Sequence, residues 1–99
     1  MNNKELKKNL ALISAKKSIL INDYYVSRVG IFGSVARGDF TRASDVDILV
    51  EFSKPVGMFH FLDLENFLNG ILHKKVDLVT RRALKSTIKK TILHEVVYA

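Results

Sequence analysis

Apolar residues recur at helical spacing in three long segments of the chain. The first runs from Lys4 to about Ile21, the second from about Met58 to Leu72, and the third from Arg82 to Val97. In each segment, large apolar residues return every three or four positions, so one face of a helix would be apolar and the other polar. The pattern predicts three amphipathic helices.

Three shorter runs have the pattern of strands. Val29–Phe32 is a continuous apolar run that stops at Gly33, which predicts a buried strand followed by a turn and a short helix. In Asp45–Phe52 the even-numbered positions are apolar and three of the odd-numbered ones are acidic, and Lys75–Thr80 is a third candidate strand. Helices and strands therefore alternate along the chain. This order indicates an α+β fold, an α/β sandwich in which helices pack on a small mixed sheet of three or four strands.

Length and composition limit the class of protein. The 99 residues, 47% hydrophobic and 26% charged, fit one globular domain over residues 1–99. The absence of cysteine excludes a disulfide framework and any thiolate zinc site. No stretch has the form of a signal peptide or reaches the roughly 18 to 20 apolar residues of a membrane span. We therefore expect a cytoplasmic protein.

The net charge of +6 is distributed unevenly. Residues 1–20 and 81–99 each carry a net charge of +4, whereas residues 21–80 carry −2. A protein that coats a phosphate backbone needs basic residues along its binding surface. An acidic centre between basic ends fits that role poorly, so nucleic-acid binding is the least favoured function. It indicates instead that carboxylates gather at one place.

Three aspartates interrupt the predicted strands and carry the candidate chemistry. Asp45 and Asp47 are two positions apart, so a strand places both on one face, where repulsion and desolvation oppose ionisation of both unless a cation neutralises them. If the third strand neighbours the second, Asp77 joins the same side of the sheet. Three carboxylates that leave positions open for phosphate oxygens are the ligand set expected for Mg²⁺, and two ions can share such a site.

A candidate phosphate seat precedes these aspartates. Gly33 ends a strand, which lets the backbone approach a phosphate closely, and the start of the following helix presents free amide hydrogens. Ser34 adds a hydroxyl donor and also suits the N-cap of that helix. Arg37 can supply positive charge to a leaving pyrophosphate, or it can be a surface or structural arginine. The sequence leaves both interpretations of Arg37 open.

The spacing of these residues resembles a known signature. Gly33 and Ser34 are followed ten residues later by Asp45-x-Asp47, and Asp77 lies about thirty residues further on. This pattern resembles the DNA polymerase beta-like nucleotidyltransferase superfamily, and the short chain is similar to its minimal nucleotidyltransferase (MNT) branch over almost its whole length. The resemblance implies that Gly33 and Ser34 bind phosphates, that Asp45 and Asp47 bind metal, and that Asp77 is a metal ligand or general base.

The resemblance also implies a reaction and a partner. Members of the superfamily transfer a nucleoside monophosphate from a triphosphate to a hydroxyl, with pyrophosphate leaving and two Mg²⁺ ions assisting. Members of the minimal branch are commonly antitoxins that silence a HEPN-domain ribonuclease toxin by transferring AMP to its tyrosine. We therefore expect a Mg²⁺-dependent protein adenylyltransferase with ATP as substrate and a HEPN-domain toxin as partner, in a hetero-oligomer or homo-oligomer. The alternative is a non-catalytic antitoxin that acts by binding alone.

Several of these residues also have a structural interpretation. An Asp-x-Asp pair alone is typical of the exposed face of an edge strand, and Asp77 alone can face solvent. Asp39, which follows Gly38, fits a turn or capping role better than a catalytic one. The apolar stripes within Phe59–Leu62 and Ile88–Val96 are predicted core, with a surface left for a partner as the alternative.

Overall fold

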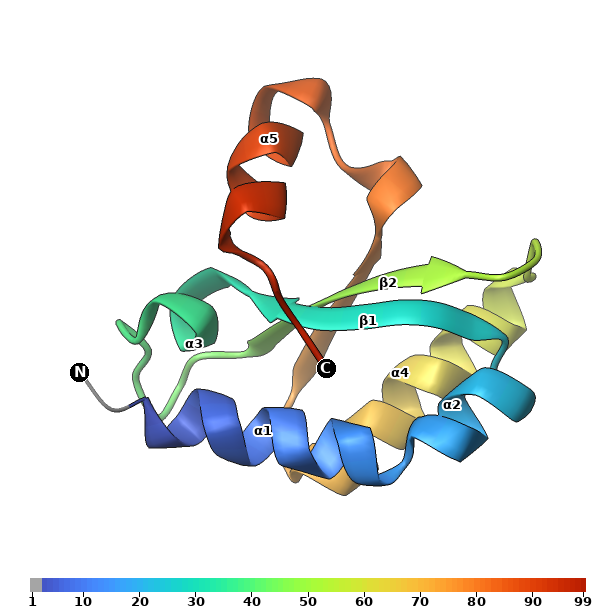
Figure 1. Ribbon diagram of the computed structural model, residues 1–99, viewed down its shortest axis with the longest axis horizontal. Coiled ribbons are helices and arrows are strands. Elements are labelled where there is room, and N and C mark those ends of the chain that lie inside the picture. The colour runs from blue at the N-terminus through green and yellow to red at the C-terminus, as the bar shows by residue number, and fades with distance from the viewer. Residues whose placement is uncertain (1–2) are drawn as a thin grey trace.

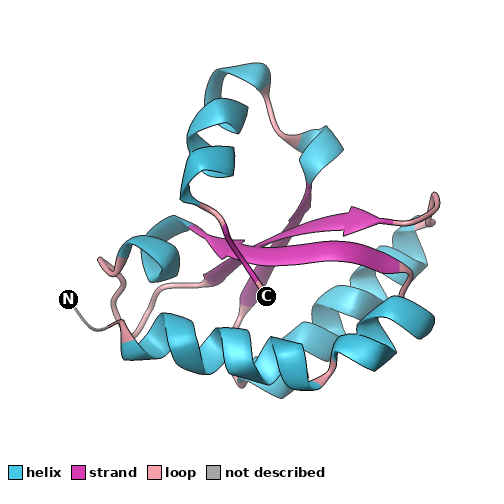
Figure 2. Ribbon diagram, in the orientation of Figure 1, coloured by secondary structure: helices cyan, strands magenta, loops and turns pink. Residues whose placement is uncertain are grey.

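The computed structural model describes residues 3–99 as a layer of helices under a sheet, with one more helix on the other side of the sheet (Figures 1 and 2). No helix in these residues is both long enough and apolar enough to cross a membrane. The helices are α1 (Lys4–Ala15), α2 (Lys17–Asn22), α3 (Gly33–Arg37), α4 (Met58–Leu72) and α5 (Ser86–Glu95). The strands are β1 (Val26–Phe32), β2 (Val46–Phe52), β3 (Val76–Thr80) and β4 (Val97–Tyr98), and a 3₁₀ turn, η1 (Arg81–Ala83), follows β3.

The strands form one open mixed sheet in the order β3-β2-β1-β4. Strand β1 is antiparallel to both β2 and β4, whereas β2 and β3 are parallel. The parallel pair is joined by α4, the kind of crossover helix that a parallel connection needs. The predicted α+β fold with a small mixed sheet is thus confirmed. Helix α4 has the predicted bounds, β1 begins three residues earlier than predicted, and β2 and β3 begin one residue later.

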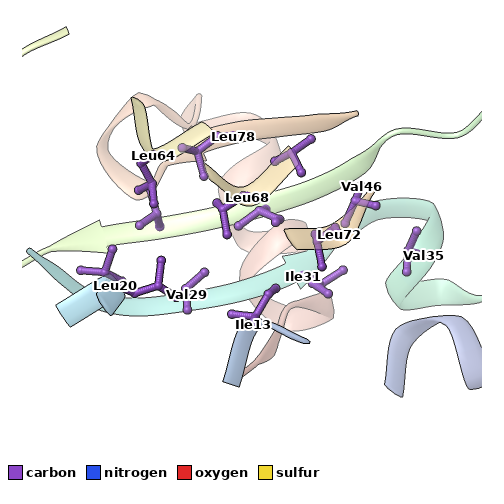
Figure 3. Packing of buried hydrophobic residues seen from close by; sticks show 14 residues of the cluster. Ile13, Leu20, Val29, Ile31, Val35, Val46, Leu64, Leu68, Leu72 and Leu78 are labelled. Atoms are coloured by element: carbon purple, nitrogen blue, oxygen red, sulfur yellow. The ribbon is translucent and has the colours of Figure 1, made fainter. Parts of the chain in front are cut away.

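The hydrophobic core lies between one face of the sheet and helices α1, α2 and α4 (Figure 3). Alternate residues of β2, namely Val46, Ile48 and Val50, are fully buried there. Leu64 and Leu68, one turn apart on α4, are buried to the same degree. Burying each side chain of this kind contributes roughly 1.5–3 kcal/mol. The core therefore fixes the register of the strands, and the register decides which side chains project from the open face.

The first predicted helix is interrupted at Lys16, which has φ −108° and ψ 15°. The prediction of one continuous helix was therefore wrong. Neither proline nor glycine lies near the break, and Ile13 and Leu20 on its two sides are both buried. Packing of each half against the core, and not a local helix breaker, therefore sets the break.

The last predicted helix, residues 82–97, is shorter at both ends. Its first residues form η1, where the Thr80 hydroxyl accepts a hydrogen bond from the Ala83 N–H at 3.2 Å. Its last residues leave the helix after Glu95 and form β4, which pairs with β1 at Gly30 and Ile31. A Cβ on Gly30 would lie 2.9 Å from the carbonyl oxygen of Val97. The absence of a side chain on Gly30 therefore leaves room for β4. The helical periodicity of residues 82–97 gave no sign of this strand.

Part of the apolar surface that was predicted as core is exposed. Phe59 is 86% exposed and Ile88 is 47% exposed. Helix α5 contains no buried residue, and it stands above the sheet on the side opposite α1, α2 and α4 (Figure 1). The structure favours the alternative in which these stripes are left partly uncovered.

Candidate active site

Two of the predicted carboxylates lie opposite each other on neighbouring strands. Asp47 of β2 pairs with Asp77 of β3 in the parallel register. Each alternates with buried residues, Val46 and Ile48 in β2 and Val76 and Leu78 in β3, so both aspartates project from the open face of the sheet. The adjacency of the second and third strands, on which the sequence argument depended, is therefore present.

Asp45 lies just before β2 and has a different neighbour. The Lys75 Nζ atom is 4.0 Å from its Oδ2, at the limit of an ion pair, and the Lys75 side chain is 81% exposed while that of Asp45 is 41% exposed. Such an exposed pair contributes little to stability. Lys75 therefore holds Asp45 only weakly.

The environment of Asp47 opposes its ionisation. Burial is the largest cause that raises the pKa of Asp47, followed by the negative charges of Asp77, Asp45 and Glu95, while Arg37 acts in the opposite direction. Removing a carboxylate from water and placing it beside others both disfavour its charged form. The site thus concentrates negative charge that a cation would neutralise.

The carboxylate cluster fits a divalent cation in charge and in donor type. Mg²⁺ prefers hard oxygen donors of this kind. Within residues 3–99, no three acidic or histidine side chains converge closely enough to hold an ion by themselves. The chain therefore offers a partial coordination sphere, which phosphate oxygens and water would complete.

Gly33 connects β1 to α3 directly beside Asp47. Its φ is +74°, a conformation that side-chain-bearing residues rarely adopt, and a Cβ added to it would collide with the Asp47 carboxylate. The residue is buried, but its N–H is directed to a hydrogen bond with Glu95 Oε1 at 2.6 Å. Only glycine lets the backbone turn this close to the carboxylate.

The short helix at Gly33 begins two residues earlier than the predicted N-cap, Ser34, implies. Helix α3 contains five residues, its N-cap is Phe32, and no side chain caps it. Ser34 is therefore inside the helix, and its predicted capping role is wrong. A helix of one turn also has a weak dipole. Anion binding at this point must depend on individual donors.

Arg37 is the charged donor at this site. Its Nε donates to Asp39 Oδ2 at 3.1 Å, and its Nη1 donates to both carboxylate oxygens of Glu95 at 3.2 Å. The hydrogen bonds to Asp39 and then to Glu95 raise the pKa of Arg37, so the guanidinium remains charged. Asp39 thus serves as the partner of Arg37, and its backbone N–H also closes the turn after α3 by donating to the Ser34 carbonyl.

Glu95 is the site residue that sequence reasoning missed. It is the last residue of α5 and lies 62 positions from Gly33 in the sequence, so no local motif connects the two. One indirect signal was available: a carboxylate at the C-terminal end of a helix opposes the helix dipole and needs a compensating partner. Here Gly33 and Arg37 provide it.

A shallow cleft of about 360 Å³ joins these groups. Gly33, Arg37, Asp47 and Glu95 form its polar side, and Phe32, Ile88, Thr91 and Ile92 complete the lining. The structure thus gathers Gly33, Arg37 and Asp47 at the cleft and places Asp77 across the strands from Asp47. Asp45 lies just before β2, and Ser34 lies within α3.

Sequence comparison identifies relatives along most of the chain. The profile of the nucleotidyltransferase domain matches residues 13–99. The chain is also 43% identical, over 88 residues, to the protein adenylyltransferase MntA of Thermococcus cleftensis, and the match covers 89% of each protein.

Solved structures show the same fold. A chain named as a minimal nucleotidyltransferase superimposes with a TM-score of 0.75 at 32% identity, over 98% of this chain and 95% of that one. A chain from the complex of a tri-AMPylated Shewanella oneidensis HEPN toxin with its MNT antitoxin has a TM-score of 0.63 at 21% identity, over 90% of this chain and 70% of that one. The second match is a likeness of fold. From the domain profile and the relatives above 30% identity, this chain belongs to the nucleotidyltransferase domain family, in its minimal nucleotidyltransferase branch.

Proposed function

We propose that this chain is the antitoxin of a HEPN/MNT pair and transfers AMP from ATP to a tyrosine hydroxyl of a HEPN-domain toxin. The MntA relative is named a protein adenylyltransferase, and a related fold occurs in a complex whose HEPN toxin carries AMP groups. The observation that carries the proposal is the pairing of Asp47 with Asp77 beside Gly33. Aspartates with only a structural role in the core or at the surface would not need to lie together beside a glycine backbone.

The proposed reaction breaks a phosphoanhydride bond of ATP and forms a phosphoester bond to the tyrosine. The tyrosine oxygen attacks the α-phosphorus of ATP, the bond from that phosphorus to the α,β-bridging oxygen breaks, and pyrophosphate leaves with the electron pair. Asp77, on the exposed edge of the site, accepts the phenol proton. Bound Mg²⁺, as one ion or two, would neutralise the charge that develops on the transferred group and on pyrophosphate.

The site residues divide into metal ligands and phosphate donors in this proposal, and Asp77 is both a metal ligand and the proton acceptor. Asp45, Asp47 and Asp77 hold the metal ions and keep the acceptor oxygen close to the α-phosphorus. The Gly33 N–H, the Ser34 hydroxyl and the Arg37 guanidinium donate to phosphate oxygens. Gly33 and Arg37 already bind a carboxylate in the structure, which supports their capacity to hold an anion.

Transfer of labelled AMP tests the proposal. The chain, its HEPN-domain toxin and ATP labelled at the α-phosphate are incubated with Mg²⁺, and the label on the toxin is measured. We expect the Asp45→Ala, Asp47→Ala double variant to lose at least two orders of magnitude in rate, because several kcal/mol of transition-state stabilisation depend on the metal ligands. Asp63→Ala, an exposed aspartate of α4, is the matched control and should label as the wild type does.

Metal dependence and toxin neutralisation give further tests of the proposal. Removal of Mg²⁺ with a chelator should abolish labelling, and titration of the ion back should restore it and show whether one or two ions are needed. If the double variant labels the toxin at the wild-type rate, the proposed site is wrong. If it fails to label but still neutralises the toxin, neutralisation depends on binding alone and not on AMP transfer.

A further inference from the structure

Two of the three donors assigned to phosphate in the proposed function, the Gly33 N–H and the Arg37 guanidinium, already bind a side chain of the protein. The Glu95 carboxylate accepts the Gly33 N–H at 2.6 Å and faces the Arg37 Nη1 with both oxygens at 3.2 Å. We propose that Glu95 is an autoinhibitory latch, which holds the phosphate seat closed until a nucleoside triphosphate displaces it. This inference rests on the proposed function and adds a regulatory step to it.

Competition follows from the chemistry of the donors. Carboxylate and phosphate oxygens are acceptors of the same kind for an N–H or a guanidinium. The Gly33 N–H has one hydrogen, and Glu95 takes it. The Nε of Arg37 is bonded to Asp39. Glu95 therefore occupies the Gly33 N–H and the Arg37 Nη1, and a triphosphate must take its place to reach these two donors.

The position of Glu95 is electrostatically unfavourable apart from these two partners. It ends α5, where the helix dipole disfavours a negative charge. Its charge also lies near enough to Asp47 to help raise the pKa of that carboxyl. The cation that accompanies a triphosphate would offset the negative charge at Asp47, so displacement of Glu95 is favoured when nucleotide and cation bind together.

Release of Glu95 does not require the core to open. Helix α5 contains no buried residue, and the Glu95 side chain is 17% exposed. The chain after α5 is tied to β1 by the pairs of Gly30 with Tyr98 and Ile31 with Val97 and by the Ala99 N–H, which donates to the Val29 carbonyl, and all of these contacts lie beyond Glu95. The side chain or the last turn of α5 can therefore move while the sheet stays intact.

Nucleotide affinity tests the latch directly. The probe is α,β-methylene-ATP with Mg²⁺, whose α,β bridge cannot be cleaved, and binding is measured by calorimetry. Because a closed state lowers apparent affinity by the fraction of protein that is open, Glu95→Ala should bind roughly tenfold more tightly than the wild type. Glu95→Gln should lie between them, since its amide oxygen still accepts from Gly33 but carries no charge. Asp63→Asn removes a charge from an exposed site on α4 and should leave the affinity unchanged.

Amide hydrogen exchange supplies the second measurement. Without nucleotide, Glu95→Ala should speed amide exchange at Gly33 and in the last turn of α5. In the wild type, the nucleotide probe should speed exchange in the last turn of α5 in the same way. Unchanged exchange in Glu95→Ala overturns the latch. So does equal or weaker nucleotide binding by both Glu95 variants, which would instead make Glu95 neutral or a ligand. If neither the wild type nor any variant binds nucleotide, the proposed function itself fails, and the proposed competition between Glu95 and nucleotide fails with it.

Discussion

The carboxylate of Asp47 lies where burial and neighbouring charges raise its pKa. The folded protein therefore binds this proton more tightly than the unfolded chain, and ionisation at pH values above the ordinary aspartate pKa, about 4, costs folding stability. In metal-free buffer we expect Asp47→Asn to raise the free energy of unfolding at pH 7, and with Mg²⁺ present the same variant should fail to transfer AMP. The gain should vanish below about pH 4, where both states are protonated. Urea unfolding at several pH values measures it, and a lower free energy for Asp47→Asn at pH 7 would contradict the assignment.

Gly33 and Gly70 form a matched pair of glycines. At Gly33 a Cβ would meet Asp47 and the φ of +74° would be strained, so Gly33→Ala should lower the free energy of unfolding by roughly 1–3 kcal/mol. It should also prevent nucleotide binding, because the backbone must shift away from Asp47. At Gly70, within α4, nothing lies within 4 Å of the added Cβ, so Gly70→Ala should stabilise by about 0.5–1 kcal/mol. Thermal unfolding and calorimetry compare the two variants, and equal effects would refute the explanation.

The edge strand β3 is held by side chains of α4. Asn69 Oδ1 accepts from the Val76 N–H at 2.7 Å, and Glu65 Oε2 accepts from the Leu78 N–H at 3.1 Å, so the two bonds flank Asp77. Asn69→Ala leaves the Val76 N–H without its partner and should cost about 1–3 kcal/mol. Because this part of β3 then loosens, AMP transfer should also fall.

Asn66→Ala is the control for this helix. Asn66 is exposed on α4, so its replacement should change the free energy of unfolding by less than about 0.5 kcal/mol and leave transfer unchanged. Denaturant unfolding and the labelling assay report the two quantities. Equal losses of stability and transfer in Asn66→Ala and Asn69→Ala would show that the effect comes from a weaker α4 helix and not from the lost hydrogen bond to Val76.

The elements that the sequence predicted well are those with a strong local pattern. The alternation in β2 and the apolar stripe of α4 depend on residues that are neighbours in the chain, and both elements form nearly where expected. The break at Lys16 and the strand β4 depend on packing with distant segments. Their residues carry a helical pattern, which tertiary contacts override.

The same division applies to the site. Gly33, Asp45 and Asp47 form a local motif, and Asp77 could be added because alternation in two strands fixes which face it shares. The role of Arg37 stayed open, and Glu95 was missed, because their meeting depends on how α5 lies over α3. A charged residue in an unfavourable place on its own helix was the only trace of that contact in the sequence.

One face of the sheet is covered by helices, and the other is largely open. Helices α1, α2 and α4 cover the apolar side of the sheet, and α5 stands over the other side (Figure 2). Asp47 and Asp77 project from that other side. A small domain of this kind has room for a nucleotidyl-transfer site but little surface to select the acceptor. In the proposed function, recognition of the acceptor tyrosine therefore depends on the shape of the partner protein.

The protein's own tyrosines lie away from the site, which gives a prediction for the isolated chain. Tyr24 and Tyr25 precede β1, whose other end, at Phe32, pairs with Asp47. At the usual rise per residue they lie about 20 Å away along the strand. Tyr98 pairs with Gly30, and its ring packs 3.8 Å below the Arg28 guanidinium, on the side away from Phe32. The isolated chain should therefore bind ATP with Mg²⁺ without labelling itself, and label should appear only on added HEPN-domain partner. Intact-mass spectrometry measures this, and an AMP adduct on a tyrosine of the isolated chain would show that acceptor choice does not depend on the partner's geometry.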